Sequence, residues 1–442
     1  MFDSFIDDQQ DFPVMVLHGY AGTGKTSVVS ALVQTLPLFN YKFLLLAPTG
    51  RAAKVISFYT GRSAFTIHKI IYKQAADPRS GQLLFKRLKN YNKKTVFVVD
   101  EASMLSAEGS FGEQGLLQDL LAFVFAHSSN KLLLIGDTAQ LPPVGQTFSA
   151  ALNRQFLHEA TGKPVLYAEL AEVMRQNEGS GILLNATNLR QLLTAGSQDI
   201  RLQTRGLADF FKMSGERLAD GLHYAYDKYG LQATIVITRA NRDAVMYNKH
   251  IRQQLLFRAE EIEVGDLLMI VRNNYFYVPP DAPSGFLANG DFVEVTKVVS
   301  LEELYGFRFA TLQLQLVDDP GQPFEARVIL ESLHTHAPAL TAAENRQLYE
   351  AVLLDYADID NKKELNEALR SDPYLNALQV KYAYAVTCHK SQGGQWQAVF
   401  IDQGYLTDER LNAEFIRWLY TAITRATKEV FLLNFHHRFF AP

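Results

Sequence analysis

The feature that most restricts the fold of this chain is a glycine-rich loop, GYAGTGKTS, at residues 19–27. The apolar run VMVL before it is typical of a buried parallel strand, and TSVVSALVQTL after it has apolar residues at helical spacing. The spacing Gly19-x4-Gly24-Lys25-Thr26 between a strand and a helix is that of a phosphate-binding loop, or P-loop. The alternative is a glycine-rich turn that precedes a helix by chance, and both flanks argue against it. The loop therefore predicts a nucleoside triphosphate site in an α/β sheet.

The residue types of this loop suit phosphate chemistry. Its glycines let backbone N–H groups close around phosphates, and the N-terminus of the following helix adds partial positive charge. We expect Lys25 to neutralise the β and γ oxygens and the Thr26 hydroxyl to ligate Mg²⁺. The predicted nucleotide contacts in the loop are Gly19, Ala21, Gly22, Thr23, Gly24, Lys25, Thr26 and Ser27.

Polar residues follow two further apolar strands. VVDEAS places Asp100 and Glu101 at a strand end, and we assign Asp100 to the metal and Glu101 to the attacking water. Alone, two adjacent acids more often form a solvated turn. IGDTAQLPPVG ends another strand, and we expect Asp137 and Gln140 to reach the γ-phosphate, with Gln140 reporting its presence to a neighbouring domain. In the alternative, Asp137 caps a backbone N–H in a proline-containing turn.

Two arginines farther along the chain are candidates for stabilising charge in phosphoryl transfer. They are Arg175 in EVMRQ and Arg425 in YTAITRAT. An arginine finger contributes roughly 10³–10⁵ in rate, and one supplied by a second domain makes hydrolysis depend on domain closure. Taken singly, either arginine fits a surface or salt-bridge role equally well.

The order of patterns predicts two stacked α/β domains with an insertion in the second. Residues 1–165 alternate strand-like and helix-like segments, and a second such region begins at 166–257. Alternating patterns and turn signals over 258–335 predict a small antiparallel barrel, and helical, acidic residues follow it. The α/β pattern returns at 379–442, so residues 258–378 are the expected insertion.

Charge is nearly balanced overall, with a net charge of −4, so a nucleic-acid groove has to be local. Residues 73–94 carry seven bases against one acid, and residues 341–372 carry eight acids against four bases. On charge alone, both segments are ordinary solvated surfaces.

A few observations concern the environment of the chain. Its single cysteine, Cys388, excludes an intrachain disulfide or a zinc site built on clustered cysteines. No apolar run reaches the ~18 residues of a membrane span, and no signal-peptide pattern is present at the start. We expect a cytoplasmic protein without membrane contact.

Eight motifs, in order, resemble those of superfamily 1 helicases. They are GYAGTGKTS, APTGRAA with TIHK, VVDEAS, GDTAQLPPVG, LAEVMRQ, TRANRD, AVTCHKSQGGQW and YTAITRAT. The likeness is strongest to the RecD-like and Dda-like subgroup, superfamily 1B, whose inserted barrel carries a string similar to FLANGD. It extends from about residue 14 to residue 434.

This resemblance implies two RecA-like domains with ATP and Mg²⁺ between them and single-stranded DNA across their tops. It also implies 5′→3′ movement and an SH3-like barrel that closes over the strand. The nucleotide roles fall on Lys25, Thr26, Asp100, Glu101, Gln140, Arg175 and Arg425, and the predicted DNA contacts are Pro48, Thr49, His68, Thr387, His389 and Lys390.

Residues 73–94 fall where the subgroup carries a pin that parts the duplex. We therefore expect the protein to bind junctions of single- and double-stranded DNA. We expect it to be a monomer. The aromatic stretch NNYFYVPP could stack on bases, but we expect it to fill the barrel core. Because acidic charge repels DNA, we expect residues 341–372 to point away from the channel and to engage a partner protein.

One departure from the family concerns base recognition. The family's adenine-recognising glutamine lies on a helix upstream of the P-loop strand, whereas Gln9 and Gln10 lie too close to that strand. We therefore expect weak discrimination between ATP and GTP.

Two other functions remain open on sequence. One is an ATP-dependent nucleic-acid clamp or remodeller that does not separate strands, and the other is an RNA helicase of the same superfamily. A small-molecule kinase is disfavoured, because it would leave Gln140, Arg175 and Arg425 spread over two domains without a reason.

Overall fold

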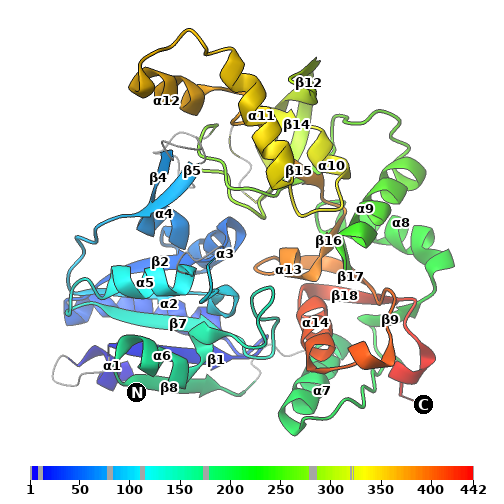
Figure 1. Cartoon of the computed structure of the whole chain (residues 1–442). Helices are drawn as coiled ribbons and strands as arrows, with labels where there is room; N and C mark the ends of the chain where they lie inside the picture. Colours follow the sequence, from blue (N-terminus) through cyan, green and yellow to red (C-terminus); the bar gives the residue numbers. More distant parts are fainter. Residues whose placement is uncertain are drawn as a thin grey trace.

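A computed structural model of the chain describes residues 2–7, 13–76, 83–109, 115–172, 179–277, 286–318, 321 and 323–441. Two α/β domains lie side by side, and a barrel with helices covers them at the top of Figure 1. No helix in these ranges is long and apolar enough to cross a membrane.

The first domain is built on a parallel sheet of order β3-β2-β6-β7-β1-β8. Alternate residues of β1 pack on opposite faces: Val14 and Val16 face α4, α5 and α6, whereas Met15 and Leu17 face α1, α2 and α3. This period of two makes a three-layer α/β/α domain. The strands are β1 (Val14–Gly19), β2 (Lys42–Ala47), β3 (Ala64–Thr66), β6 (Thr95–Val99), β7 (Lys131–Gly136) and β8 (Val165–Leu170). The helices are α1 (Phe2–Ile6), α2 (Lys25–Thr35), α3 (Gly50–Thr60), α4 (Ile67–Ile71), α5 (Leu116–Val124) and α6 (Arg154–Thr161).

The domain boundary predicted at residue 165 is wrong by one strand. Strand β8 pairs in parallel with β1 from Val14↔Val165 to Gly19↔Leu170, so it completes the first sheet. Its apolar pattern resembles the strands of either domain, and only pairing assigns it.

The second domain is a parallel sheet of order β16-β10-β17-β18-β9. Its strands are β9 (Phe210–Met213), β10 (Thr234–Thr238), β16 (Ala385–Thr387), β17 (Trp396–Asp402) and β18 (Ala426–Leu433). Its helices are α7 (Gly181–Ala195), α8 (Leu218–Tyr229), α9 (Asn241–His250), α13 (Cys388–Ser391) and α14 (Ala413–Ile423), and a π-helical turn, Ile251–Leu255, extends α9.

The inserted barrel is closed by five strands, and the last of them lies beyond the acidic helices. Strand β15 pairs with both β11 and β14, although the sequence pattern assigned part of it to the returning α/β domain. All five of its residues are buried, so its pattern resembles a central parallel strand. The strands are β11 (Leu267–Ile270), β12 (Phe292–Leu304), β13 (Phe307–Leu316), β14 (Phe324–Ile329) and β15 (Leu378–Tyr382).

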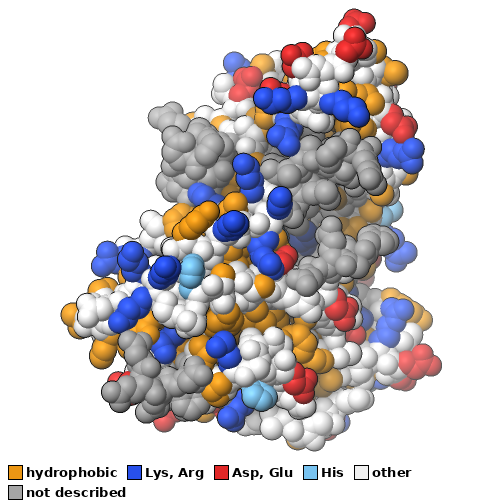
Figure 2. Space-filling model, turned by 60° about the vertical axis from the view of Figure 1, so that its left-hand side comes forward, with side chains coloured by type: hydrophobic (Ala, Val, Ile, Leu, Met, Phe, Trp, Pro, Cys, Tyr) orange, Lys and Arg blue, Asp and Glu red, His pale blue; other side chains and the backbone are white. Residues whose placement is uncertain are grey.

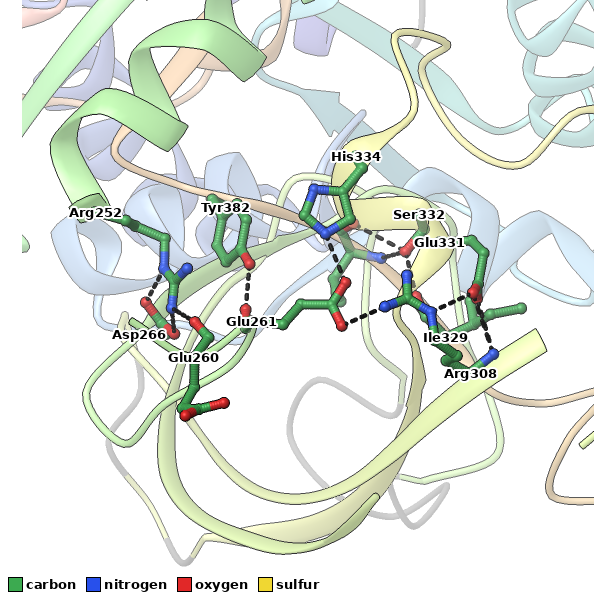
Figure 3. Close-up of polar contacts among 11 residues, drawn as sticks. Arg252, Glu260, Glu261, Asp266, Arg308, Ile329, Glu331, Ser332, His334 and Tyr382 are labelled. Carbon is green, nitrogen blue, oxygen red and sulfur yellow. Dashed lines mark hydrogen bonds and ion pairs between the residues drawn. The ribbon is translucent and has the colours of Figure 1, made fainter. Parts of the chain in front are cut away.

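A buried carboxylate anchors the base of the barrel to the second domain. Asp266 is fully buried and receives both arms of Arg252 at 2.8 Å, Arg258 at 2.9 Å and the Tyr384 hydroxyl at 2.8 Å. Figure 3 shows the pair of Arg252 and Asp266 beside a second network, in which Glu261 contacts His334 and Arg308.

Three helices lie on the barrel: α10 (Glu331–His334), α11 (Ala342–Leu354) and α12 (Lys362–Ser371). Helix α12 lies at the outer end of the barrel in Figure 1. Asn345 in the first turn of α11 accepts a hydrogen bond from Arg272 (3.1 Å), a residue of the groove described below. That the acidic side chains of residues 341–372 point away from the channel stays a prediction.

The basic segment 73–94 divides between two places. Strands β4 (Tyr72–Ala76) and β5 (Leu83–Arg87) form an antiparallel hairpin in which Lys73 lies opposite Lys86. Lys94 instead directly precedes strand β6 in the body of the first domain, where its ammonium lies over the Tyr41 ring. The segment is therefore not one continuous pin. Arg79 lies outside the described residues.

Candidate functional site

The P-loop joins β1 to α2 with a backbone suited to anions. Gly22 and Gly24 have φ values of +82° and +81°, a left-handed region that glycine adopts without steric cost. Lys25 donates hydrogen bonds from Nζ to the carbonyls of Gly19 (2.6 Å) and Tyr20 (3.0 Å), which hold its charge within the loop. With the N–H groups at the start of α2, this arrangement fits a nucleotide phosphate.

The predicted acid pair lies beside this lysine. Burial and the neighbouring Glu101 charge raise the pKa of Asp100 to about 6, while the Lys25 ammonium acts in the opposite direction. Asp100 accepts a hydrogen bond from the Glu101 N–H (2.9 Å), and Glu101 has a φ of +51°, which is strained for a residue with a side chain. The end of strand β6 thus places the Asp100 carboxylate within reach of the Lys25 charge, with Glu101 next in the chain.

A magnesium site can be assembled here from oxygen ligands. The Thr26 hydroxyl, in the first turn of α2, and the Asp100 carboxylate are the hard donors that Mg²⁺ prefers, with nucleotide phosphates completing the set. The parts of the chain described hold no cluster of three or more His, Cys, Asp or Glu residues arranged for a metal.

Asp137 and Gln140 lie at the seam between the two domains. Asp137 caps the Ala139 N–H (2.9 Å), as in the alternative interpretation, but its other oxygen accepts a hydrogen bond from the Tyr420 hydroxyl of α14 (2.7 Å). Gln140 is 5% exposed, and its side-chain oxygen has no hydrogen-bond partner among the described residues. Both residues are thus enclosed at the seam.

Other side chains of the second domain hold the same loop of the first domain. Thr421 accepts a hydrogen bond from the Leu141 N–H (2.9 Å), Gln392 donates to the Leu141 carbonyl (3.0 Å), and Arg417 donates to the Thr138 carbonyl. Sequence reasoning did not assign these residues. Thr421 and Gln392 lie inside recognised motifs, so the signal was present, whereas nothing in the sequence marked Arg417.

The two predicted arginine fingers have different outcomes. Arg175 lies outside the described residues. Arg425 is buried, and its guanidinium donates to the Thr421 carbonyl (3.1 Å), the Thr424 hydroxyl (3.3 Å) and the Gly394 carbonyl (3.4 Å), all in the second domain. Its charge also acts on the Tyr420 hydroxyl, whose pKa it lowers. Its role as a finger stays a prediction.

A groove of about 520 Å³ runs between both α/β domains and the barrel. Its barrel wall includes Arg272 and the ANG turn of FLANGD, residues 288–290. Lys390 spans the groove's edge and donates to Asn289 (2.6 Å), joining the second domain to the barrel. Of the predicted DNA contacts, the groove brings together Pro48, Thr49, His68, His389 and Lys390, and Thr387 lies beside it in a small pocket that Lys390 also lines.

Burial shapes the charge of this groove. It lowers the pKa of His68 and of His389, which favours neutral rings, and lowers the pKa of Lys390 to about 8. An anion next to Lys390 would offset this desolvation. Figure 2 shows basic side chains numerous across the middle and left of one face, with acidic ones mainly at the top and right.

Arg51 connects all three parts of the molecule. Its guanidinium lies 4.2 Å from the Trp396 ring centre and 4.8 Å from that of Phe292, and it pairs with Asp318 at 3.4 Å. It follows the APTG string directly, yet sequence reasoning assigned only Pro48 and Thr49 there.

The aromatic stretch of the barrel follows its predicted role in part. Tyr275 stacks on Phe286 with ring centres 4.7 Å apart, and Tyr277 packs against the core. Phe276 is 41% exposed, so the prediction of core filling is wrong for this residue.

Two family descriptions match the chain: an AAA domain over residues 8–205 and a UvrD-like helicase C-terminal domain over residues 382–433. The ATP-dependent RecD2 DNA helicase of Deinococcus radiodurans is 33% identical over 32% of this chain and 18% of its own length. The ATP-dependent DNA helicase dda of Enterobacteria phage T4 is 29% identical over 40% of this chain and 37% of its own length. The chain thus spans well under half of either relative.

A crystal structure of Pif1 helicase from Bacteroides in complex with ADP-AlF3 and ssDNA shares the fold. It covers 98% of this chain and 92% of that chain, with a TM-score of 0.51 and 17% identity. The predicted architecture, two RecA-like domains with a small barrel and helices inserted in the second, is confirmed. The motifs and these matches support a superfamily 1B helicase of the RecD-like and Dda-like kind, and the fold agrees with them.

Proposed function

We propose that this protein is an ATP-driven DNA helicase that moves 5′→3′ along one strand and separates the duplex ahead of it. The observation that carries the proposal is the groove whose walls come from both RecA-like domains and the barrel. The P-loop lies at the seam between the same two domains. A movement of one domain against the other at this seam therefore changes the width of the groove.

On the nucleotide side, Lys25 and the loop amides bind phosphates, and Thr26 and Asp100 hold Mg²⁺. Bound MgATP supplies the phosphoryl group that is transferred to water. Glu101 orients that water, and Gln140 senses the terminal phosphate from its enclosed position at the seam. Arg175 and Arg425 supply positive charge when the domains close.

On the DNA side, the hairpin of β4 and β5 supports strand separation. Lys73 and Lys86 are both exposed and lie directly opposite each other, where like charges repel. Two phosphates of a duplex would relieve this repulsion. The printed names of the RecD2 and dda relatives favour DNA over RNA, and a monomer is sufficient because one chain supplies the whole groove.

The deciding experiment is unwinding of one duplex that carries either a 5′ or a 3′ single-stranded tail, with ATP and Mg²⁺. Unwinding from the 5′ tail alone, lost in Lys25→Ala, is the expected result. Unwinding from the 3′ tail would contradict the polarity.

Two outcomes of the same assay would favour the other candidate functions. DNA-stimulated ATP turnover without unwinding points to a clamp or remodeller. Unwinding that requires an RNA tail points to an RNA helicase, since the 2′-OH is what lets a site distinguish the two.

A further inference from the structure

The hydroxyl of Tyr420 lies in the P-loop itself, although this tyrosine belongs to the second domain. It accepts a hydrogen bond from the Ala21 N–H at 3.0 Å and donates one to Asp137 at 2.7 Å. The side chain is 1% exposed, so both bonds are shielded from water. One oxygen atom thus connects the phosphate loop, the strand end of β7 and helix α14.

Ala21 is one of the loop residues expected to contact the nucleotide, and the group it can offer to a phosphate is its backbone N–H. An oxygen at 3.0 Å from that nitrogen occupies the place that a phosphate oxygen needs, because one N–H makes one good hydrogen bond. The Tyr420 hydroxyl and a phosphate oxygen are therefore alternatives at this amide.

The hydroxyl keeps its proton in this position. Burial and the Asp137 charge raise the pKa of Tyr420 well above its usual value, so it donates to Asp137 throughout the physiological range. Its remaining capacity is that of an acceptor, which the Ala21 N–H fills.

We propose that Tyr420 is a positioning residue that competes with nucleotide for the Ala21 amide and so couples phosphate binding to the position of α14. The inference rests on the proposed function, since it concerns the same nucleotide site. When a phosphate oxygen takes the Ala21 N–H, the Tyr420 hydroxyl loses its donor and α14 loses one of its contacts with the first domain.

The neighbours of Tyr420 explain why such a shift would matter. Arg417 and Thr421, on the same helix, hold the 138–141 loop, and Arg425 follows at the end of α14. Release of Tyr420 frees the helix to move and with it the arginine that is expected to approach the nucleotide.

The test compares Tyr420→Phe with a matched control, Tyr384→Phe. Tyr384 has the same pair of bonds elsewhere, accepting from the Leu267 N–H (3.2 Å) and donating to Asp266 (2.8 Å). Dissociation constants for ADP are measured by calorimetry without DNA, and Lys25→Ala verifies that binding occurs at the P-loop.

Removing the competing hydroxyl should tighten ADP binding by about two- to ten-fold in Tyr420→Phe, the range for loss of one hydrogen bond, and leave it unchanged in Tyr384→Phe. Unchanged or weaker binding in Tyr420→Phe overturns the inference. ADP binding requires neither hydrolysis nor unwinding, so a protein that failed the tailed-duplex assay could still pass this one.

Hydrogen exchange in the wild-type chain covers the case in which the variant does not fold. ADP should increase amide exchange in residues 413–423 of α14 while decreasing it in the P-loop. Protection of both segments would contradict competition.

Discussion

The guanidinium of Arg51, from the first RecA-like domain, lies 4.2 Å from the ring centre of Trp396 in the second. The barrel supplies a second ring, Phe292, which lies edge to face against Trp396, and the ion-pair partner, Asp318. One side chain thus joins the two motor domains to the barrel at the edge of the groove.

Replacing Arg51 should reduce coupling between DNA binding and ATP turnover. Lysine retains the charge but lacks the flat guanidinium that lies against both rings, so Arg51→Lys should lower DNA stimulation several-fold with little change in basal turnover. The measurement is ATPase rate against DNA concentration. Exposed Arg62, just beyond the end of α3, provides the control Arg62→Lys, and equal behaviour of the two variants would refute the coupling role.

Asp266 should be critical for stability. Asp266→Asn leaves Arg252 and Arg258 without their buried counter-charge, which costs about 3–5 kcal/mol in the free energy of unfolding. Urea denaturation measures it. Glu350→Gln removes the exposed pair with Arg346 and should leave the free energy of unfolding nearly unchanged; a similar cost for both variants would contradict the anchoring role.

Magnesium-dependent nucleotide binding should weaken in acid. The pKa of Asp100 is raised to about 6, so its carboxylate is mostly charged at pH 7.5 and mostly protonated at pH 5, where a proton competes with Mg²⁺. Titrations of Mg²⁺ with a fluorescent nucleotide across this range should show affinity falling below a midpoint near pH 6. In Glu101→Gln the midpoint should move to lower pH, because the charge that raises the pKa is gone. If the pH midpoint is the same in Glu101→Gln as in the unchanged protein, Asp100 is not the titrating group.

The hairpin should matter for unwinding more than for turnover. Lys86→Glu removes the proposed phosphate contact and gives Lys73 an opposite charge across the strands, so duplex separation should fall several-fold while hydrolysis stimulated by single-stranded DNA persists. Unwinding and turnover are followed on the tailed duplex. Lys93→Glu, near the start of β6 and outside the hairpin, should have little effect; equal loss in both variants would indicate general charge attraction.

Prediction from sequence succeeded where function depends on neighbours in the chain. The spacing of Gly19, Gly24 and Lys25 specifies a loop in which Gly22 and Gly24 adopt positive φ. Asp100 and Glu101 directly follow a buried strand. Strand ends of a parallel sheet meet at one edge, which brings these groups together.

The remaining features depended on packing between segments distant in sequence. Strand β15 and strand β8 were assigned to the wrong units because a buried apolar run has the same pattern in any sheet. Tyr420 was passed over in favour of Arg425, although it is Tyr420 that touches the P-loop, 399 residues away in the chain.

The sequence by itself determined the chemistry of this protein: a P-loop, its acid pair and the order of motifs, each encoded within a few consecutive residues. The tertiary structure decided which side chains cross from one domain to another, namely Arg51, Arg417, Tyr420 and Lys390. Such contacts arise from how two folded surfaces meet, and that depends on shape and burial summed over both domains, which no local pattern contains.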